Sequence, residues 1–213
     1  MEIFFWSDYA CPYCYIGETN LKAALRELGL PCDLKMRSFE LSPGASDSCP
    51  GPTRDLIARK YGLSSEQADS SIRRIDRMAA EAGLTVDFGS TRYTSTFDAH
   101  RLTKYAETQP GGKADELGEQ LFRSGFTLCA ELADHKVLLA AARAVGLEED
   151  AVREVLASDA FAGDVRADEQ AAHEYGVAGV PYFVIDGEYA VPGALGREEW
   201  IRVLKMILDR KVG

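Results

Sequence analysis

Positive charge is scarce in this sequence of 213 residues, in which 24 lysines and arginines stand against 34 aspartates and glutamates. With a formal net charge of −10, a nucleic acid or another polyanion is not expected as a partner. No basic segment and no long apolar run precede the first predicted strand, so no secretion signal is evident. If Met1 is the native start, we expect a cytoplasmic protein without a membrane partner.

Cysteine and histidine are few, and most of them are scattered. The five cysteines form an odd and irregular set, unlike the disulfide framework of a secreted domain. The three histidines form no H-x₃₋₅-H pair, and zinc would need two further, closely spaced ligands beyond one cysteine pair. We therefore expect no metal. No repeat or linker is evident, which favours one large domain, or one domain with a sizeable insertion.

One pair of cysteines is closely spaced, in the segment Cys11-Pro12-Tyr13-Cys14. The apolar run at residues 3–6 predicts a buried strand just before this segment. The apolar spacing over residues 16–28 predicts a helix just after it. The pair is therefore expected where a strand passes into a helix, a setting that a purely structural disulfide would not require.

This setting suits redox chemistry. Cys11 falls at the predicted helix N-cap, and Pro12 falls at the first helical position, where its missing N–H breaks no hydrogen bond. The amino end of a helix favours an anion, and the thiolate is the reactive form of cysteine. Cys14 lies one turn further along. We predict that Cys11 is the attacking thiolate, that Cys14 resolves the mixed disulfide, and that Pro12 and Tyr13 tune the pair.

Residues 2–38 predict a strand, a helix and a second strand, parallel to the first. The loop that follows, at residues 40–52, is rich in proline and glycine and should start near the Cys11 end of the sheet. Cys49 lies in this loop, and an exposed cysteine without a role is favoured over an auxiliary redox thiol. Cys32 and Cys129 are expected to be small core residues.

Residues 53–160 are helical in pattern almost throughout. Residues 84–88 predict a short extended piece, and Thr96 is expected to cap the helix that carries His100. For His100 two interpretations stay open: a contact near the redox pair, or a partly buried histidine bonded to a helix end or loop, which is favoured. The other helices are predicted at residues 54–61, 65–83, 113–126, 137–145 and 149–157.

The last third of the chain predicts a helix at residues 167–175, a hairpin at 179–191 and an amphipathic helix at 197–210. Pro181 begins the hairpin. Proline is tolerated at the first residue of a strand, and a trans bond is the ordinary expectation for it. A cis Val180–Pro181 bond would be rarer, so it needs further support from the rest of the chain.

The order of these elements resembles the thioredoxin fold: a strand, a C-x-x-C segment at a helix cap, and a late Gly-Val-Pro before a hairpin and a final helix. The large helical block between the two halves resembles the DsbA branch of that fold. Within that branch the chain is similar to the FrnE-like proteins, which are grouped with the 2-hydroxychromene-2-carboxylate isomerases. The matching segments are 11–17 (CPYCYIG), 39–43 (FELSP), 60–64 (KYGLS), 67–68 (QA), 96 with 99–102 (T and AHRL), 121–122 (LF), 179–186 (GVPYFVID) and 189–191 (YAV).

The resemblance implies an α/β thioredoxin-like fold with a large helical insertion. It places the core at residues 1–45 and 163–213 and the inserted helical domain at residues 46–162. It also implies a cis Val180–Pro181 bond packed against Cys11 and Cys14, with the Val180 and Pro181 backbone pairing with an extended substrate. No cofactor is required, although glutathione is expected as an electron partner or co-substrate.

Three departures from the relatives bear on function. The isomerases have serine where this chain has Cys11, and they use glutathione as cofactor, so Cys11 favours dithiol chemistry. The dipeptide Pro12-Tyr13 replaces the Pro-His of strongly oxidising DsbA proteins and the Pro-Trp common in FrnE-like proteins, so we expect a less oxidising protein than DsbA. Residues 127–130 replace an acidic, glycine-containing stretch, with no consequence that we can derive.

Three hypotheses follow. The first is a thiol–disulfide oxidoreductase that exchanges disulfides with protein thiols or glutathione through Cys11 and Cys14. The second is a glutathione-dependent isomerase or transferase acting on a small aromatic or polyketide-like molecule, which would need a deep apolar pocket. The third is a redox-responsive binding protein or chaperone. The sequence leaves the direction of exchange and the oligomeric state open.

Overall fold

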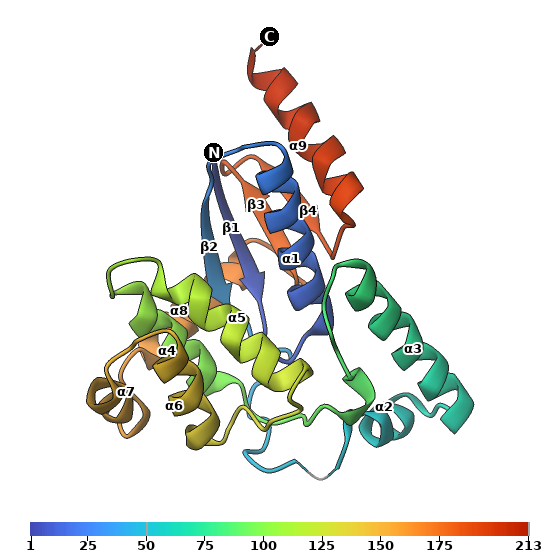
Figure 1. The fold of residues 1–213 in the computed structure, drawn as a ribbon, viewed down its shortest axis with the longest axis vertical. Coiled ribbons are helices and arrows are strands. Elements are labelled where there is room, and N and C mark those ends of the chain that lie inside the picture. The colour runs from blue at the N-terminus through green and yellow to red at the C-terminus, as the bar shows by residue number, and fades with distance from the viewer. Residues whose placement is uncertain (50, 213) are drawn as a thin grey trace.

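The computed structural model describes residues 1–49 and 51–212 and has a mixed four-stranded sheet at its centre (Figure 1). The strands are β1 (Glu2–Ser7), β2 (Asp33–Ser38), β3 (Tyr182–Ile185) and β4 (Tyr189–Pro192), in the order β2-β1-β3-β4. The β1 and β2 strands are parallel, as predicted, and β3 is antiparallel to both β1 and β4. The predicted α/β class is therefore confirmed.

Helices make up most of the remaining chain. The helix ends predicted from glycines and caps are largely confirmed, including the reciprocal hydrogen bonds between Ser64 and Gln67 that open α3. The helices are α1 (Pro12–Glu27), α2 (Thr53–Tyr61), α3 (Ser65–Glu81), α4 (Phe97–Glu107), α5 (Lys113–Phe126), α6 (His135–Ala144), α7 (Glu149–Leu156), α8 (Ala162–Glu174) and α9 (Arg197–Val212), with a 3₁₀ turn η1 (Phe88–Ser90).

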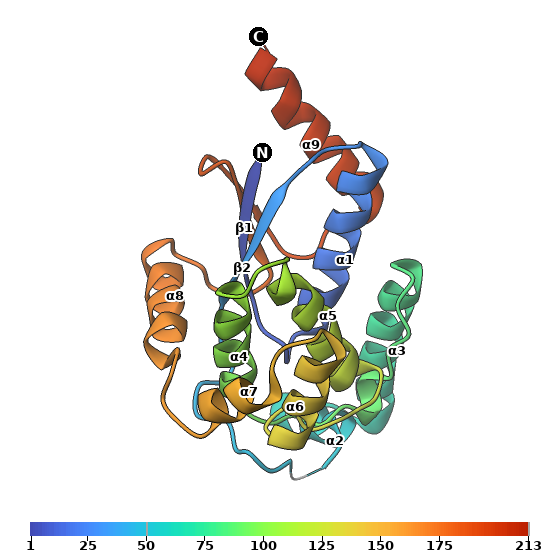
Figure 2. The ribbon, with the colours of Figure 1, turned by 60° about the vertical axis from the view of Figure 1, so that its left-hand side comes forward.

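Each face of the sheet is covered by helices (Figure 2). On one face α1 and α9 pack against sheet side chains such as Phe5 and Phe183, and α9 contributes Trp200; all three side chains are fully buried. On the other face α8 packs against Trp6, whose indole N–H donates a hydrogen bond to the Asp168 carbonyl at 2.8 Å. Burial of each large apolar side chain contributes about 1.5–3 kcal/mol to stability, so these contacts fix the sheet between the two layers.

The helices α2–α7 gather at the end of the sheet where β1 and β2 finish (Figures 1 and 2). Their core includes Leu121 and Phe122, and it also takes in Tyr9, Cys11 and Cys14. The cysteine pair therefore lies where the helical block meets the sheet. We propose the division into residues 1–45 with 163–213 and residues 46–162 as a description of this arrangement; Pro50 and Gly213 fall outside the described residues.

Two predicted elements differ from the structure. Residues 84–87 do not form a strand, and the chain here is held by other bonds: the Asp87 N–H donates to the Phe126 carbonyl at 3.0 Å, and the Thr127 hydroxyl donates to the Thr85 carbonyl at 2.6 Å. The helix predicted from residue 167 begins earlier, at Ala162. It follows Phe161, which has a left-handed φ of 62° and provides no side-chain cap that could mark the start.

The three cysteines outside the pair are half-buried. The prediction that Cys32 and Cys129 are core residues is therefore wrong: Cys32 lies just before the edge strand β2, and Cys129 lies in the loop after α5, with φ of 51°. Burial is still sufficient to raise the pKa of both thiols, which keeps them protonated. The Cys49 thiol donates a hydrogen bond to the Gly51 carbonyl at 2.7 Å, within its own loop.

Candidate active site

The turn between β1 and α1 places Cys11 at the helix N-cap. Cys11 has extended backbone angles, and no side chain caps the helix at this end. Its N–H donates to the Asp8 carbonyl at 3.0 Å, and its own carbonyl accepts from the Cys14 N–H at 3.1 Å. Pro12 occupies the first turn, as predicted. The Cys11 side chain therefore lies at the amino end of α1, which is the positive end of the helix dipole.

The two cysteines differ in exposure, and burial acts strongly on Cys14. Cys11 retains 3% of its surface and Cys14 retains none. Burial raises the pKa of the Cys14 thiol well above its ordinary value, and the adjacent Cys11 sulfur raises it further. Both cysteines are in the reduced state in this structure. Cys11 is therefore the sulfur that a partner can reach, while Cys14 is held as a neutral thiol behind it.

The loop before β3 approaches Cys11 from the other end of the chain. The Cys11 thiol lies 3.5 Å from the Val180 carbonyl oxygen, and the Val180–Pro181 peptide bond is cis, as the resemblance implied. Gly17 permits this approach, because a Cβ atom there would lie 3.2 Å from the Pro181 ring. The Pro181 carbonyl accepts a hydrogen bond from the Gly193 N–H at 2.8 Å, which anchors the loop to the end of β4.

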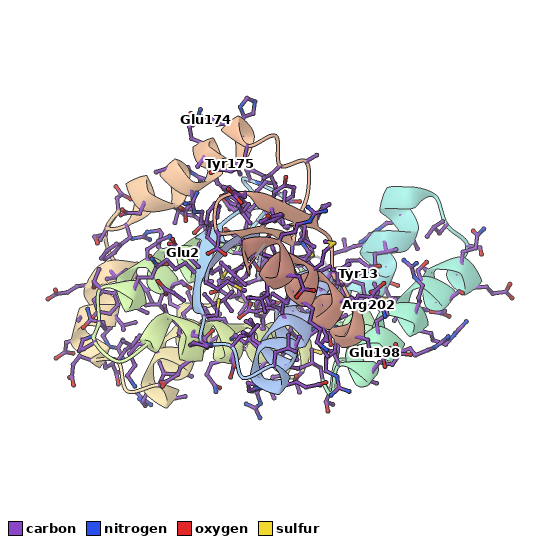
Figure 3. The ribbon with its side chains drawn as sticks, turned by 90° about the horizontal axis from the view of Figure 1, so that it is seen from above. Glu2, Tyr13, Glu174, Tyr175, Glu198 and Arg202 are labelled. Atoms are coloured by element: carbon purple, nitrogen blue, oxygen red, sulfur yellow. The ribbon has the colours of Figure 1, made fainter. Side chains whose placement is uncertain are left out.

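Tyr13 is half-buried and connects the pair to the helical block. Its hydroxyl accepts a hydrogen bond from the Arg74 guanidinium of α3 at 2.9 Å, and its side chain lies on the side of the molecule that faces α3 (Figure 3). No sequence signal predicted Arg74 at this site, because its spacing along α3 is that of an ordinary exposed residue. The contact places one wall of the site on α3.

His100 does not match the favoured interpretation, a partly buried histidine bonded to a helix end or loop. It is fully buried rather than partly buried, and its ring lies against Tyr9 with the ring centres 5.0 Å apart. Its Nε2 atom is 3.5 Å from the Asp8 carboxylate, which sequence reasoning missed. Thr96 does begin α4, but its hydroxyl donates to Asp8 at 2.8 Å instead of capping the helix, so that part of the prediction is wrong.

Metal-ligating side chains do not cluster in the described residues. No group of three or more histidine, cysteine, aspartate or glutamate side chains there is arranged to hold a metal ion. Within the same residues, no helix is both long and apolar enough to cross a membrane.

A sequence model of the DSBA-like thioredoxin domain matches residues 2–200. The chain belongs to this family. The crystal structure of a probable DsbA oxidoreductase from Streptomyces coelicolor is similar over 97% of this chain and 89% of that chain, with a TM-score of 0.89 and 35% identity. The DsbA-like thioredoxin fold expected from the sequence is thereby confirmed.

Two other relatives of this DsbA-like chain differ in activity. The 2-hydroxychromene-2-carboxylate isomerase of Sphingobium xenophagum is 24% identical over 188 residues, which cover 86% of this chain and 88% of the isomerase. The cytosolic disulfide reductase DsbM from Pseudomonas aeruginosa, solved with GSH, is 17% identical, with a TM-score of 0.65 over 98% of this chain and all of that chain. At that identity the likeness to DsbM shows the fold alone.

Proposed function

We propose that this DsbA-like protein is a thiol–disulfide oxidoreductase of the FrnE-like type, working through Cys11 and Cys14 in the cytoplasm. The observation that carries the proposal is the asymmetry of the pair. Cys11 lies at a helix N-cap, within 3.5 Å of the Val180 carbonyl, whereas Cys14 is fully buried and its pKa is raised by that burial. Such a pair can react with a partner through one sulfur and release it through the other.

In the oxidising direction, a partner thiolate attacks Cys11 Sγ of the Cys11–Cys14 disulfide. The Cys11–Cys14 bond breaks, Cys14 takes up a proton, and a mixed disulfide forms. A second partner thiolate then attacks the partner sulfur, so the partner leaves as a disulfide and Cys11 leaves as the helix-capped thiolate. In the reducing direction Cys11 attacks the partner disulfide, and Cys14 loses its proton and displaces the partner.

The Val180–Pro181 loop is the proposed binding contact for the partner. Pro181 is buried against Gly17, while Val180 is only half-buried and its carbonyl already lies against the Cys11 sulfur. An extended peptide beside Val180 would have its own sulfur close to Cys11, held by main-chain hydrogen bonds. Glutathione, which accompanies the reductase DsbM in its structure, is the proposed low-molecular-weight partner.

The alternative, an isomerase or transferase, expects a deep apolar pocket between the helical block and the thioredoxin-like core. A cleft of about 400 Å³ does lie beside β2, between that strand and α4 and α5. Its lining includes the charged side chains of Lys104, Glu107 and Asp168, and it includes neither Cys11 nor Pro181. This cleft is therefore not placed to bring an apolar substrate to the thiol, and the oxidoreductase is the function that the geometry supports best.

The reduction potential of the Cys11–Cys14 pair tests the proposal. The protein would be equilibrated with glutathione buffers, and the fraction of disulfide read by thiol trapping and mass spectrometry. We expect a reversible two-electron couple between the values of thioredoxin, about −270 mV, and DsbA, about −120 mV. A potential near that of DsbA would indicate a disulfide-forming protein, and a potential near that of thioredoxin would indicate a reductase. The absence of a reversible couple would contradict the proposal.

A substitution at Gly17 tests the proposed role of the Val180–Pro181 loop. Gly17→Ala would place a Cβ 3.2 Å from Pro181 Cγ and 3.2 Å from Ala194 Cα, so the loop must move. We expect exchange with a protein substrate to slow by roughly tenfold, because a small misplacement of reacting groups has large kinetic effects. Gly163→Ala is the matched control, since it is also helical and has nothing within 4 Å. Equal rates for both variants would exclude the loop from partner binding.

A further inference from the structure

An arginine of the helical block is bonded to a residue of the redox segment. The Arg74 guanidinium donates a hydrogen bond from Nη2 to the Tyr13 hydroxyl at 2.9 Å. Tyr13 is two residues after Cys11, in the first turn of α1. Two residues of chain span at most about 7 Å, so Arg74 is anchored to a side chain that starts close to Cys11. The bond therefore brings a positive charge to the border of the candidate active site.

The position of Arg74 is set by the packing of α3. Ile72, Ile75 and Ala79 of this helix are buried in the same hydrophobic core as Cys11. Arg74 itself is exposed and so points out of that core. The helix is therefore fixed relative to the redox pair by its buried side, while its exposed side presents the guanidinium to solvent.

Most donors of the Arg74 guanidinium are without a partner among the described residues. An arginine has five N–H groups, and the Tyr13 hydroxyl accepts from one of them. Within the same part of the chain, no aspartate or glutamate forms an ion pair with Arg74. Arg54 of α2, by contrast, makes a fork of two bonds to Asp69, at 2.5 and 2.9 Å. Such a planar fork is the geometry in which an arginine binds a carboxylate.

The carboxylates nearest to Cys11 and Arg74 in the sequence are already bound to other groups. They are Asp8, held by the N–H groups of Ala10 and Leu41, Glu18, held by Lys22, Asp69, held by Arg54, and Asp76, held by the Phe88 N–H. The first turn of α1 contains no acidic residue, although the whole chain has a formal net charge of −10. A partner can therefore supply the carboxylate that Arg74 lacks.

We infer that Arg74 is a specificity-determining residue, which binds a carboxylate of a small thiol while the sulfur of that thiol reacts with Cys11. The inference rests on the proposed oxidoreductase function and gives it a substrate class, the low-molecular-weight thiols that carry a carboxylate. Glutathione has this chemistry, because both residues that flank its cysteine carry a carboxylate. One glutathione thiolate forms a mixed disulfide with Cys11, and Cys14 takes up a proton as it is released. A second displaces Cys11, and both leave as glutathione disulfide.

The expected preference is modest, because Arg74 is exposed. An exposed ion pair is weak and is screened by salt. The bond to Tyr13 holds the guanidinium in place, however, so less side-chain freedom is lost when a carboxylate binds. We expect the contact to favour an anionic thiol by about fivefold over the same thiol without its carboxylates.

The rates at which glutathione and glutathione diethyl ester reduce the Cys11–Cys14 disulfide test the assignment. The two probes share one thiol, but the ester has no carboxylate. Reduction would be followed by thiol trapping and mass spectrometry. Arg74→Gln should lower the ratio of the glutathione rate to the ester rate about fivefold. Arg74→Lys should lower it less, because an ammonium group keeps the charge without the fork.

Arg77→Gln is the matched control. Arg77 is also exposed on α3, and its replacement removes the same charge, but it does not bond to Tyr13. This variant should keep the rate ratio of the unmodified protein. Equal ratios for Arg74→Gln and the unmodified protein, or an equal fall in Arg74→Gln and Arg77→Gln, would overturn the inference.

An equilibrium measurement makes the result independent of changes in rate. Cys14→Ser would be mixed with equal amounts of the disulfides of glutathione and of its ester, and the two Cys11 adducts weighed by intact mass. Addition of Arg74→Gln should lower the share of the glutathione adduct, and an unchanged share would overturn the inference. If neither probe reduces the pair or forms an adduct, the oxidoreductase function itself is contradicted.

Discussion

Replacement of Cys11 by serine is expected to reduce disulfide exchange to the uncatalysed rate. Cys11 is the sulfur at the helix N-cap and beside Val180, and a hydroxyl cannot form a disulfide. Cys14→Ser should behave differently, because Cys11 can still react with one partner molecule. Without the resolving thiol, the mixed disulfide should accumulate. Turnover of a fluorescent disulfide substrate, with intact-mass detection of the trapped adduct, measures both outcomes.

Cys49→Ser provides the matched control for these two variants. Cys49 undergoes the same chemical change but lies in the loop after β2, where its thiol bonds to its own loop. Its exchange rate should equal that of the unmodified protein. Retained turnover in Cys11→Ser would refute the assignment of the attacking thiol, and loss of turnover in Cys49→Ser would show that a third cysteine takes part.

Replacement of Arg101 by alanine should lower the free energy of unfolding by about 3 kcal/mol, because it removes a buried guanidinium that donates to one buried and two part-buried carbonyl groups. The Arg101 side chain is 5% exposed and lies on α4. Its Nε donates to the Ala160 carbonyl at 2.9 Å, and its Nη2 donates to the carbonyls of Val155 and Ser158. These carbonyls lie at the end of α7 and in the segment before α8, so one guanidinium joins α4 to both.

Urea unfolding followed by circular dichroism measures this loss. Arg101→Lys should recover only part of it, since an ammonium group cannot supply the same fork of donors. Arg153→Ala is the matched control: that arginine also pairs with a carboxylate, Glu149, but its side chain is 57% exposed. Its removal should leave the unfolding midpoint unchanged within error. Equal effects at Arg101 and Arg153 would show that the buried bonds add nothing to stability.

Much of the fold could be predicted because its signals are local. Alternation in β2, the apolar run of β1 and the Asp186-Gly187 turn specify strands and a hairpin from a few residues each. Ser64 with Gln67 marks the start of α3 through two hydrogen bonds within one turn. The start of α8 could not be predicted in this way, because Phe161 is not a capping residue and the helix is held by packing.

The candidate site was only partly predictable, because some of its residues come together only through contacts between distant parts of the chain. The adjacent residues Cys11 to Cys14 form a pattern that sequence alone reveals, and the structure places the Val180–Pro181 loop against Cys11 as expected. Asp8 gave no local signal, since its partners Leu41 and Thr96 are adjacent to it only after folding. Thr96 was expected to cap α4, but its hydroxyl accepts no helix N–H and instead donates to the Asp8 carboxylate, a contact that exists only in the folded chain.

The distance along the chain between the two halves of the site has a consequence for biosynthesis. Cys11 and Val180 are separated by 169 positions, so both cysteines leave the ribosome long before the loop that completes the site. Until β3 is made, β1 has β2 on one side and an open edge on the other. A nascent or truncated chain would therefore carry the two thiols without the Val180 carbonyl, which is the contact proposed to orient a partner. If the loop binds the partner as proposed, selectivity is gained only during translation of the last sixth of the protein, residues 180–213.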